Sequence, residues 1–404
     1  MRQRVKRLHY ILPFAAVLTG LACQERLAAP AECPELCPGG YTIYEDTLFA
    51  LPGQDSAAVG YLLAGQGTSL RVSQNFPVSE DRALYRFTRR ADSLTINGVV
   101  KPVSIDSIAL ELSVLYRDTT VHGLKVFLYR LPVTVDSSWN FAQVDAAFTP
   151  GNLIDSIAVP DSLVTKRLRA VFVGSDTSRL SIPAADSARL AVGVAIRANS
   201  GTGVRIGGAG AGSSAPSFIN YVSVANSDTS TVDRIITPSI VFNNFVQQSP
   251  PALDPDLLTV GGVPSARSWI RFPWSNRLKD SATIIRATLQ LMPAAPLQGL
   301  NGDTAQVLVR PVLADFGAKS PGVTTTGFTT ATPLLPGTTD TVDIEVRTQL
   351  NTWQGSKPVP PFMLMQLSPE VSSFSRFTFG STRTPGKVPR IIVTYALKFP
   401  FGEP

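Results

Sequence analysis

Residues whose types and spacing could support chemistry are few in this sequence. It contains no G-x-S-x-G turn of a serine hydrolase and no H-E-x-x-H pair of a zinc protease. The stretch GSTRTPGKV (380–388) approaches a phosphate-binding loop, but Val388 stands where Ser or Thr would hold magnesium. Asp343 and Glu345 share one face of an expected strand, and nothing pairs them across a cleft as glycoside hydrolysis requires. We therefore predict a protein that is not an enzyme and uses no cofactor, with a hydrolase as the alternative.

Aromatic rings offer a second kind of chemistry, because a flat π-face can stack on the apolar face of a sugar. Of the four tryptophans, Trp274 follows Phe272 and Pro273 at the end of an alternating apolar pattern. We predict that Trp274 has the most exposed ring and is the candidate ligand-binding residue. Large aromatic side chains are mostly buried, so packing at the core or its rim is the competing interpretation.

The first 22 residues have the organisation of an export signal. Basic residues at the start are followed by an apolar stretch over 8–22 and by small residues before Cys23. This stretch is shorter than the ~18 to 20 residues that span a bilayer, and Pro13 interrupts it. The sequence therefore predicts a cleaved signal, not a permanent transmembrane helix.

The end of this segment, LTGLACQ, resembles the lipobox of bacterial lipoproteins. The resemblance implies that Cys23 becomes the lipidated first residue of the mature chain, although Gly20 stands where the family prefers leucine. Gln24 is not the aspartate associated with inner-membrane retention, which implies an outer-membrane lipoprotein and leaves the periplasmic or surface face open. The alternative is an ordinary signal peptide, cleaved after Ala22 or Ala31, that releases a soluble secreted protein.

The remaining two cysteines, Cys33 and Cys37, lie in the expected tether over 23–38. An exported chain meets an oxidising compartment, so we predict a local disulfide between them. A zinc site would need four ligands, and His122 is the only histidine left after cleavage of the signal, so we predict no metal.

The charge pattern argues against nucleic acid as a partner. Charged residues make up only 16% of the 404 residues, and the formal charge is +6. Four of the positive charges lie in the export segment, which contains no acid, so the mature chain would carry +2. No basic stripe remains that could follow a phosphate backbone.

Any site must be positioned by β-strands, and the sequence contains two similar series of strand segments. The stretches RALYRF (82–87), IDSIALELSVLY (105–116) and SFINYVSV (217–224) return as RSWIRF (267–272), ATIIRATLQLM (282–292) and RIIVTYAL (390–397). Period-two alternation predicts half-buried strands. The inward residues are expected to be Ile108, Leu110, Leu112 and Val114 in the first copy, and Ile285, Ala287, Leu289 and Leu291 in the second.

This repeat spacing is right for duplicated domains, each with its own core. We predict one domain over 39–224, a polar linker over 225–234 and a second domain over 235–398. Long connections between the strand pairs favour a Greek-key jelly roll over a meander of hairpins. The predicted fold class is therefore all-β, as two tandem antiparallel jelly-roll β-sandwich domains with little helix.

The second domain resembles DNRLRE-type domains, which are related to jelly-roll carbohydrate-binding modules of the alginate-binding kind. The residues that carry the resemblance are LTVGGVPSARSWIRF (258–272), IIRATLQL (284–291), VDIEVRTQLNTWQG (342–355) and IIVTY (391–395). The first domain matches more weakly, through YRLPVTVDSSWN (129–140), where the family continues with glutamate and this chain has Asn140. The resemblance implies a jelly-roll fold, with Trp139 in a structural turn and Trp353 packed on the sandwich.

These observations predict an exported, lipid-anchored, non-catalytic protein of the cell envelope that binds a polysaccharide through its sandwich domains. The polysaccharide step depends on analogy between folds. The alternative is a structural or adhesive envelope protein with protein partners only, which would present a large exposed apolar patch without a groove.

Overall fold

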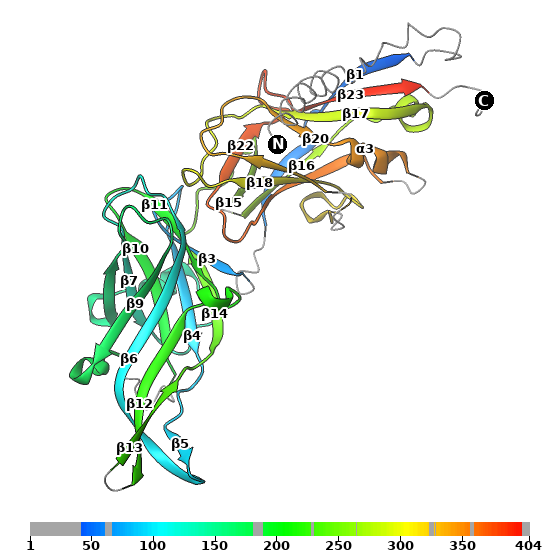
Figure 1. The fold of residues 1–404 in the computed structure, drawn as a ribbon. Helices are drawn as coiled ribbons and strands as arrows, with labels where there is room; N and C mark the ends of the chain where they lie inside the picture. The colour runs from blue at the N-terminus through cyan, green and yellow to red at the C-terminus, as the bar shows by residue number, and fades with distance from the viewer. Residues whose placement is uncertain are drawn as a thin grey trace, which may run out of the picture.

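The structure is a computed structural model that describes residues 42–60, 67–180, 189–227, 230–263, 265–322, 327, 329–355 and 359–397. In these ranges the chain forms two antiparallel β-sandwiches, seen as two lobes that meet at one end of each (Figure 1). Each sandwich has a hydrophobic core of its own, and little of the described chain is helical. The predicted all-β fold class is confirmed. No helix in the described ranges has the length and apolar character needed to cross a bilayer.

Sandwich 1 is formed by residues 69–247. Its strands are β3 (Ser69–Gln74), β4 (Asp81–Phe87), β5 (Ser93–Ile96), β6 (Val99–Arg117), β7 (Lys125–Leu131), β8 (Leu153–Ala158), β9 (Lys166–Val173), β10 (Ala191–Arg197), β11 (Thr202–Gly207), β12 (Ser217–Ser227), β13 (Ser230–Ile236) and β14 (Ile240–Gln247). One layer has the strand order β13-β12-β6-β9, and the facing layer contains β4-β10-β7-β8. A short helix, α2 (Phe141–Asp145), lies between β7 and β8.

Sandwich 2 is formed by residues 43–59 and 257–397. Its strands are β1 (Ile43–Phe49), β2 (Asp55–Val59), β15 (Leu257–Gly262), β16 (Ser265–Arg271), β17 (Ala282–Leu291), β18 (Ala305–Pro311), β19 (Thr330–Leu334), β20 (Val342–Glu345), β21 (Phe362–Ser368), β22 (Arg376–Gly380) and β23 (Arg390–Leu397). The layers have the orders β1-β23-β17-β20 and β16-β21-β18-β19. The same order of eight strands in both sandwiches is that of a jelly roll. The predicted helix before Trp353 is α3 (Arg347–Gln354).

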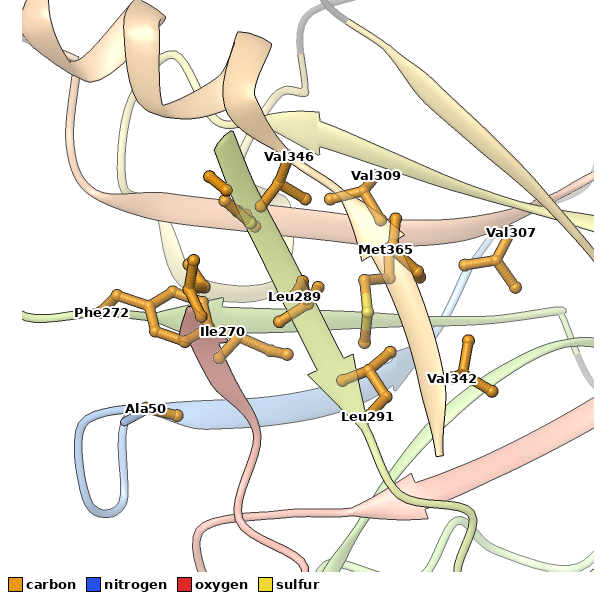
Figure 2. Packing of buried hydrophobic residues seen from close by; sticks show 14 of the residues in the cluster. Ala50, Ile270, Phe272, Leu289, Leu291, Val307, Val309, Val342, Val346 and Met365 are labelled. Atoms are coloured by element: carbon orange, nitrogen blue, oxygen red, sulfur yellow. The ribbon is translucent and has the colours of Figure 1, made fainter. Parts of the chain in front are cut away.

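The core of sandwich 2 forms because alternate residues of facing strands point into the space between the layers. Figure 2 shows Ile270 of β16, Leu289 and Leu291 of β17 and Met365 of β21 meeting there. Ala287, Leu289 and Leu291 are fully buried, as the alternation predicts.

The prediction for Ile285 is wrong. Ile285 is 44% exposed, whereas Ile284 is buried. The pairing of β17 with β23 shifts between Ile284 and Arg286, and such an irregularity reverses which residues face inward. In sandwich 1 the four inward residues predicted on β6 are all buried, but so are Ala109 and Ser113 on the other face.

The predicted start of the first domain is wrong, because the first two strands pair with strands of sandwich 2. β1 pairs along its whole length with β23, and β2 pairs with β16. Residues 43–59 therefore belong to sandwich 2, not to a domain over 39–224. Local alternation could not reveal this, because it indicates that a segment is a strand without indicating which distant strand it pairs with.

The predicted linker over 225–234 is also wrong. It contains the end of β12 and most of β13, which pair with each other from Asn220↔Ile236 to Ser227↔Ser230. β14 then pairs with β4, so residues 235–247 belong to sandwich 1. β13 is an edge strand with exposed residues on both faces, and for that reason its sequence lacks the apolar alternation that predicts a strand.

The two sandwiches meet in a buried joint. The fully buried guanidinium of Arg71 donates to the backbone carbonyls of Gly262 and Ser373 in sandwich 2. Arg205 forms an ion pair of 2.9 Å with Asp303 across the same boundary. The apolar part of the joint consists of Val263, Leu300 and Phe374, with Phe76, Val78 and Tyr116 packed against them. Hydrogen bonds, an ion pair and apolar packing together hold the two sandwiches against each other at this joint.

Candidate functional site

The candidate site is a pocket of about 430 Å³ on the outer face of the β16-β21-β18 sheet of sandwich 2. Its floor comes from these three strands, one wall comes from β2, and the opposite wall comes from the segment after β18. The lining residues are Val59, Gly60, Arg267, Trp269, Arg310, Ala318, Lys319, Ser320, Pro321, Gly322, Leu364 and Gln366.

Strand alternation places the floor residues in this pocket. Ile270, Val309 and Met365 point into the core, so their neighbours in sequence point to the outer face. Leu364 is directly opposite Trp269 on one side and Arg310 on the other, which makes a row across three strands. The row puts an apolar surface next to a guanidinium.

The pocket contains two arginine side chains, and only one of them forms an ion pair with a described acidic residue. Arg267 forms an ion pair of 2.8 Å with Glu370. No ion pair or hydrogen bond of Arg310 occurs with any residue that the structure describes, and its Nε is buried without an acceptor. Burial, and then repulsion from Arg267, lower the pKa of Arg310. A bound anion would relieve both effects, because an opposite charge favours the charged form.

Trp269 adds a second donor without an acceptor. Its side chain is 4% exposed and lines the pocket, and its Nε1 has no hydrogen-bond partner among the described residues. Buried tryptophan N–H groups usually have a partner. None of the lining residues is an acid, and Lys319 adds a further positive charge on the wall. The described part of the pocket therefore offers donors and cations to a ligand that supplies acceptors.

An exposed aromatic ring stands on the wall segment of the same pocket. Phe316 is 68% exposed and immediately precedes residues 317–319, two of which line the pocket. Asp315 beside it pairs with Arg271, at 2.5 and 2.8 Å, and this fixes the start of the segment. The wall segment therefore begins with an exposed aromatic ring, a kind of group that sugar recognition uses.

The equivalent face of sandwich 1 is occupied by the protein itself. Arg82 corresponds to Arg267 in the repeated RALYRF and RSWIRF motifs, but its guanidinium lies between the rings of Phe141 and Phe148, at 4.6 and 4.4 Å. Asp145 of α2 also pairs with Arg82, at 2.6 Å. The longer connection between β7 and β8 thus closes in sandwich 1 the site that is open in sandwich 2.

Trp274 does not line this pocket, and its role as a ligand-binding residue stays a prediction. It is half-buried and packs against the core, with its ring edge-on to Trp353 at 5.2 Å. Trp353 is buried and Trp139 is half-buried. Trp269 is the aromatic residue that lines the candidate pocket, and the sequence signal for it was its alternation with the inward Ile270. Arg310 had no such signal, because its isolation depends on residues far away in the sequence.

The other residues that the sequence suggested as candidates either form hydrogen bonds within the fold or lie outside the described ranges. Glu345 accepts a hydrogen bond of 2.9 Å from the backbone of Arg347 at the start of α3, and Asp343 accepts one of 3.0 Å from Gln290. No group of three or more potential metal ligands occurs among the described residues. Cys23, Cys33 and Cys37 lie outside them, so the lipidation and the disulfide remain predictions.

The chain matches no protein-family model, and a search of curated proteins found no match either. The fold and the pocket are therefore the basis for any statement about function.

Proposed function

We propose that this protein is an exported, lipid-anchored and non-catalytic protein of the cell envelope that binds an acidic polysaccharide in the pocket of sandwich 2. The observation that carries the proposal is the guanidinium of Arg310, which lies beside Trp269 and Leu364 and has no ion pair or hydrogen bond with any described residue. A carboxylate or sulfate group of a sugar would accept hydrogen bonds from Arg310 and Trp269 in this pocket. Lipidation at Cys23, in an outer-membrane lipoprotein, is part of this proposal.

The chemistry of the pocket favours an anionic polymer over a neutral one. A neutral sugar would leave the half-buried charge of Arg310 next to Arg267 without a compensating anion, and covering a charge without a partner is unfavourable. A hydrogen bond to a charged group contributes about 1.5 to 3 kcal/mol. Loss of this bond corresponds to roughly a tenfold to hundredfold loss of affinity.

The test uses two polymers with the same backbone, polygalacturonate and its fully methylated ester, at low and at physiological salt. We expect the protein to be retained by the acid and not by the ester. Arg310→Gln should weaken retention by about tenfold or more. Arg286→Gln is the matched control, because Arg286 is exposed on β17 in the other layer and its loss changes net charge equally.

Two results would count against the proposal in different ways. If neither polygalacturonate, alginate nor sulfated dextran retains the protein, acidic polysaccharide is the wrong ligand class. If retention is strong but Arg310→Gln and Arg286→Gln reduce it equally, the polymer binds elsewhere on the surface. In the first case the alternative of an envelope protein with protein partners only becomes the leading proposal.

A further inference from the structure

The two halves of the chain contain equivalent strands, and each half places its first two strands in the other half's sandwich. β1 pairs antiparallel with β23, as β13 pairs with β12, and β2 pairs with β16, as β14 pairs with β4. β1 and β2 belong to the half before residue 228, whereas β23 and β16 belong to the half after it. The opposite holds for β13 and β14. The exchange is therefore reciprocal.

We infer that the two halves of this chain, residues 42–227 and 230–397, are binding partners of each other, joined as a strand-exchanged pair. The surface that each half offers is a pair of open sheet edges, and the partner that fits it is the two-strand segment of the other half. The connection between Ser227 and Ser230 is then dispensable for holding the molecule together.

The extent of pairing supports this inference. β1 contributes seven residue pairs with β23 and β2 contributes five with β16. In the other direction β13 contributes seven pairs with β12, and β14 contributes seven with β4. Backbone pairing along four ladders is the way in which extended segments add to open sheet edges, with inward side chains adding specificity.

Polar contacts hold the exchanged segment of the first half in place. The buried carboxylate of Asp55, on β2, accepts hydrogen bonds from the backbone and hydroxyl of Thr382, at 2.8 and 2.6 Å. Arg383 forms an ion pair of 3.1 Å with the same carboxylate. Both partners lie in GSTRTPGKV, so this stretch, which resembles a phosphate loop, holds a carboxylate of the other half.

The exchanged segment of the second half is held in a matching way. Phe245 of β14 lies under the buried guanidinium of Arg71, with 4.4 Å between the guanidinium carbon and the ring centre. Gln247 donates to the hydroxyl of Ser79, at 3.2 Å. Each exchanged segment is thus bound by side chains as well as by backbone ladders.

The experiment cuts the folded protein at the connection between the halves. A protease recognition site is inserted between Asp228 and Thr229 of the full chain, and the purified protein is cleaved and passed through a size-exclusion column in non-denaturing buffer. We expect both fragments to elute together at the volume of the uncut protein. At about 1 µM no more than about a tenth should be free, which corresponds to a Kd below roughly 10 nM.

A matched variant separates strand exchange from simple contact at the joint. Phe374→Ala removes a buried aromatic side chain of the joint, and Phe374 belongs to none of the four ladders. The uncut variant serves as the folding control. Strand exchange predicts that the cut Phe374→Ala protein also stays together. Separation of the fragments in native buffer, with or without Phe374→Ala, would overturn the inference.

Discussion

Replacing two inward residues of β1 should destabilise sandwich 2, which is formed mostly by residues 257–397. Tyr44 and Leu48 are half-buried and pack against the core of sandwich 2, although they precede sandwich 1 in sequence. The perturbation is the double substitution Tyr44→Ala and Leu48→Ala. If each domain were a continuous piece of chain, the same change would affect sandwich 1.

The expected magnitude follows from what these side chains contact. The ring of Tyr44 stacks on Tyr395 at 5.7 Å, and the guanidinium of Arg277 lies 4.5 Å from its centre. Complete burial would make an aromatic or leucine truncation cost about 2 to 5 kcal/mol. Since both residues are half-buried, we expect about half of that for each, and about 3 kcal/mol for the pair.

The assay is hydrogen exchange read peptide by peptide, under conditions in which exchange requires opening of a whole sandwich. A loss of about 3 kcal/mol speeds such exchange by about two powers of ten. Peptides that cover β17 and β23 should lose protection, and those that cover β6 and β12 should keep it. The reciprocal control is Val232→Ala with Ile236→Ala in β13, which should affect β6 and β12 instead.

The reasoning would be refuted by the opposite distribution. If Tyr44→Ala with Leu48→Ala lowered protection in β12 and left β23 unchanged, β1 would complete sandwich 1 in solution. Equal loss in both sandwiches would show that they open as one unit, and the two separate cores would then have no thermodynamic independence.

Two further predictions concern the anchor and the joint. Cys23→Ala should move the protein from the membrane to the soluble fraction, and unchanged fractionation would show that the anchor is misassigned. Burial raises the pKa of Asp81 to about 6, from an ordinary value of 3.8, next to the buried Arg71 at 3.4 Å. The folded protein therefore takes up a proton as pH falls through about 6, before the unfolded chain does, so this group favours folding at low pH and loses that effect as pH rises. From pH 7 to 4 the free energy of unfolding, measured with urea, should rise relative to that of Asp81→Asn; a constant difference would contradict the shifted pKa.

The fold class could be predicted because its signals are local. Alternation in β6 and β17 identified strands, and Leu289, Leu291 and Leu110 are buried as expected. The repeated RALYRF and RSWIRF motifs indicated two similar sandwiches, and both occupy the equivalent strands β4 and β16. The error at Ile285 came from a shift in pairing that no local pattern reveals.

The candidate site could be predicted only in part. An outward position for Trp269 was compatible with its alternation, but its place in a pocket depends on Leu364 and on the wall around Lys319. Trp274 was expected to be exposed, and the tertiary structure instead packs it against Trp353, nearly eighty residues later in the chain. Arg310 became a candidate only because the structure shows no ion pair between it and any described residue.

The sequence by itself determined that this chain forms strands, that they are duplicated and which side chains are apolar enough to be buried. These properties follow from composition and from a period of two residues, which each segment carries within itself. Only the tertiary structure decided that β1 and β2 complete the far sandwich, that β13 is a strand and that one basic pocket is open while its counterpart is filled. Backbone hydrogen bonds are the same for every pair of strands, so the choice of partner depends on contacts made after the chain has folded back on itself.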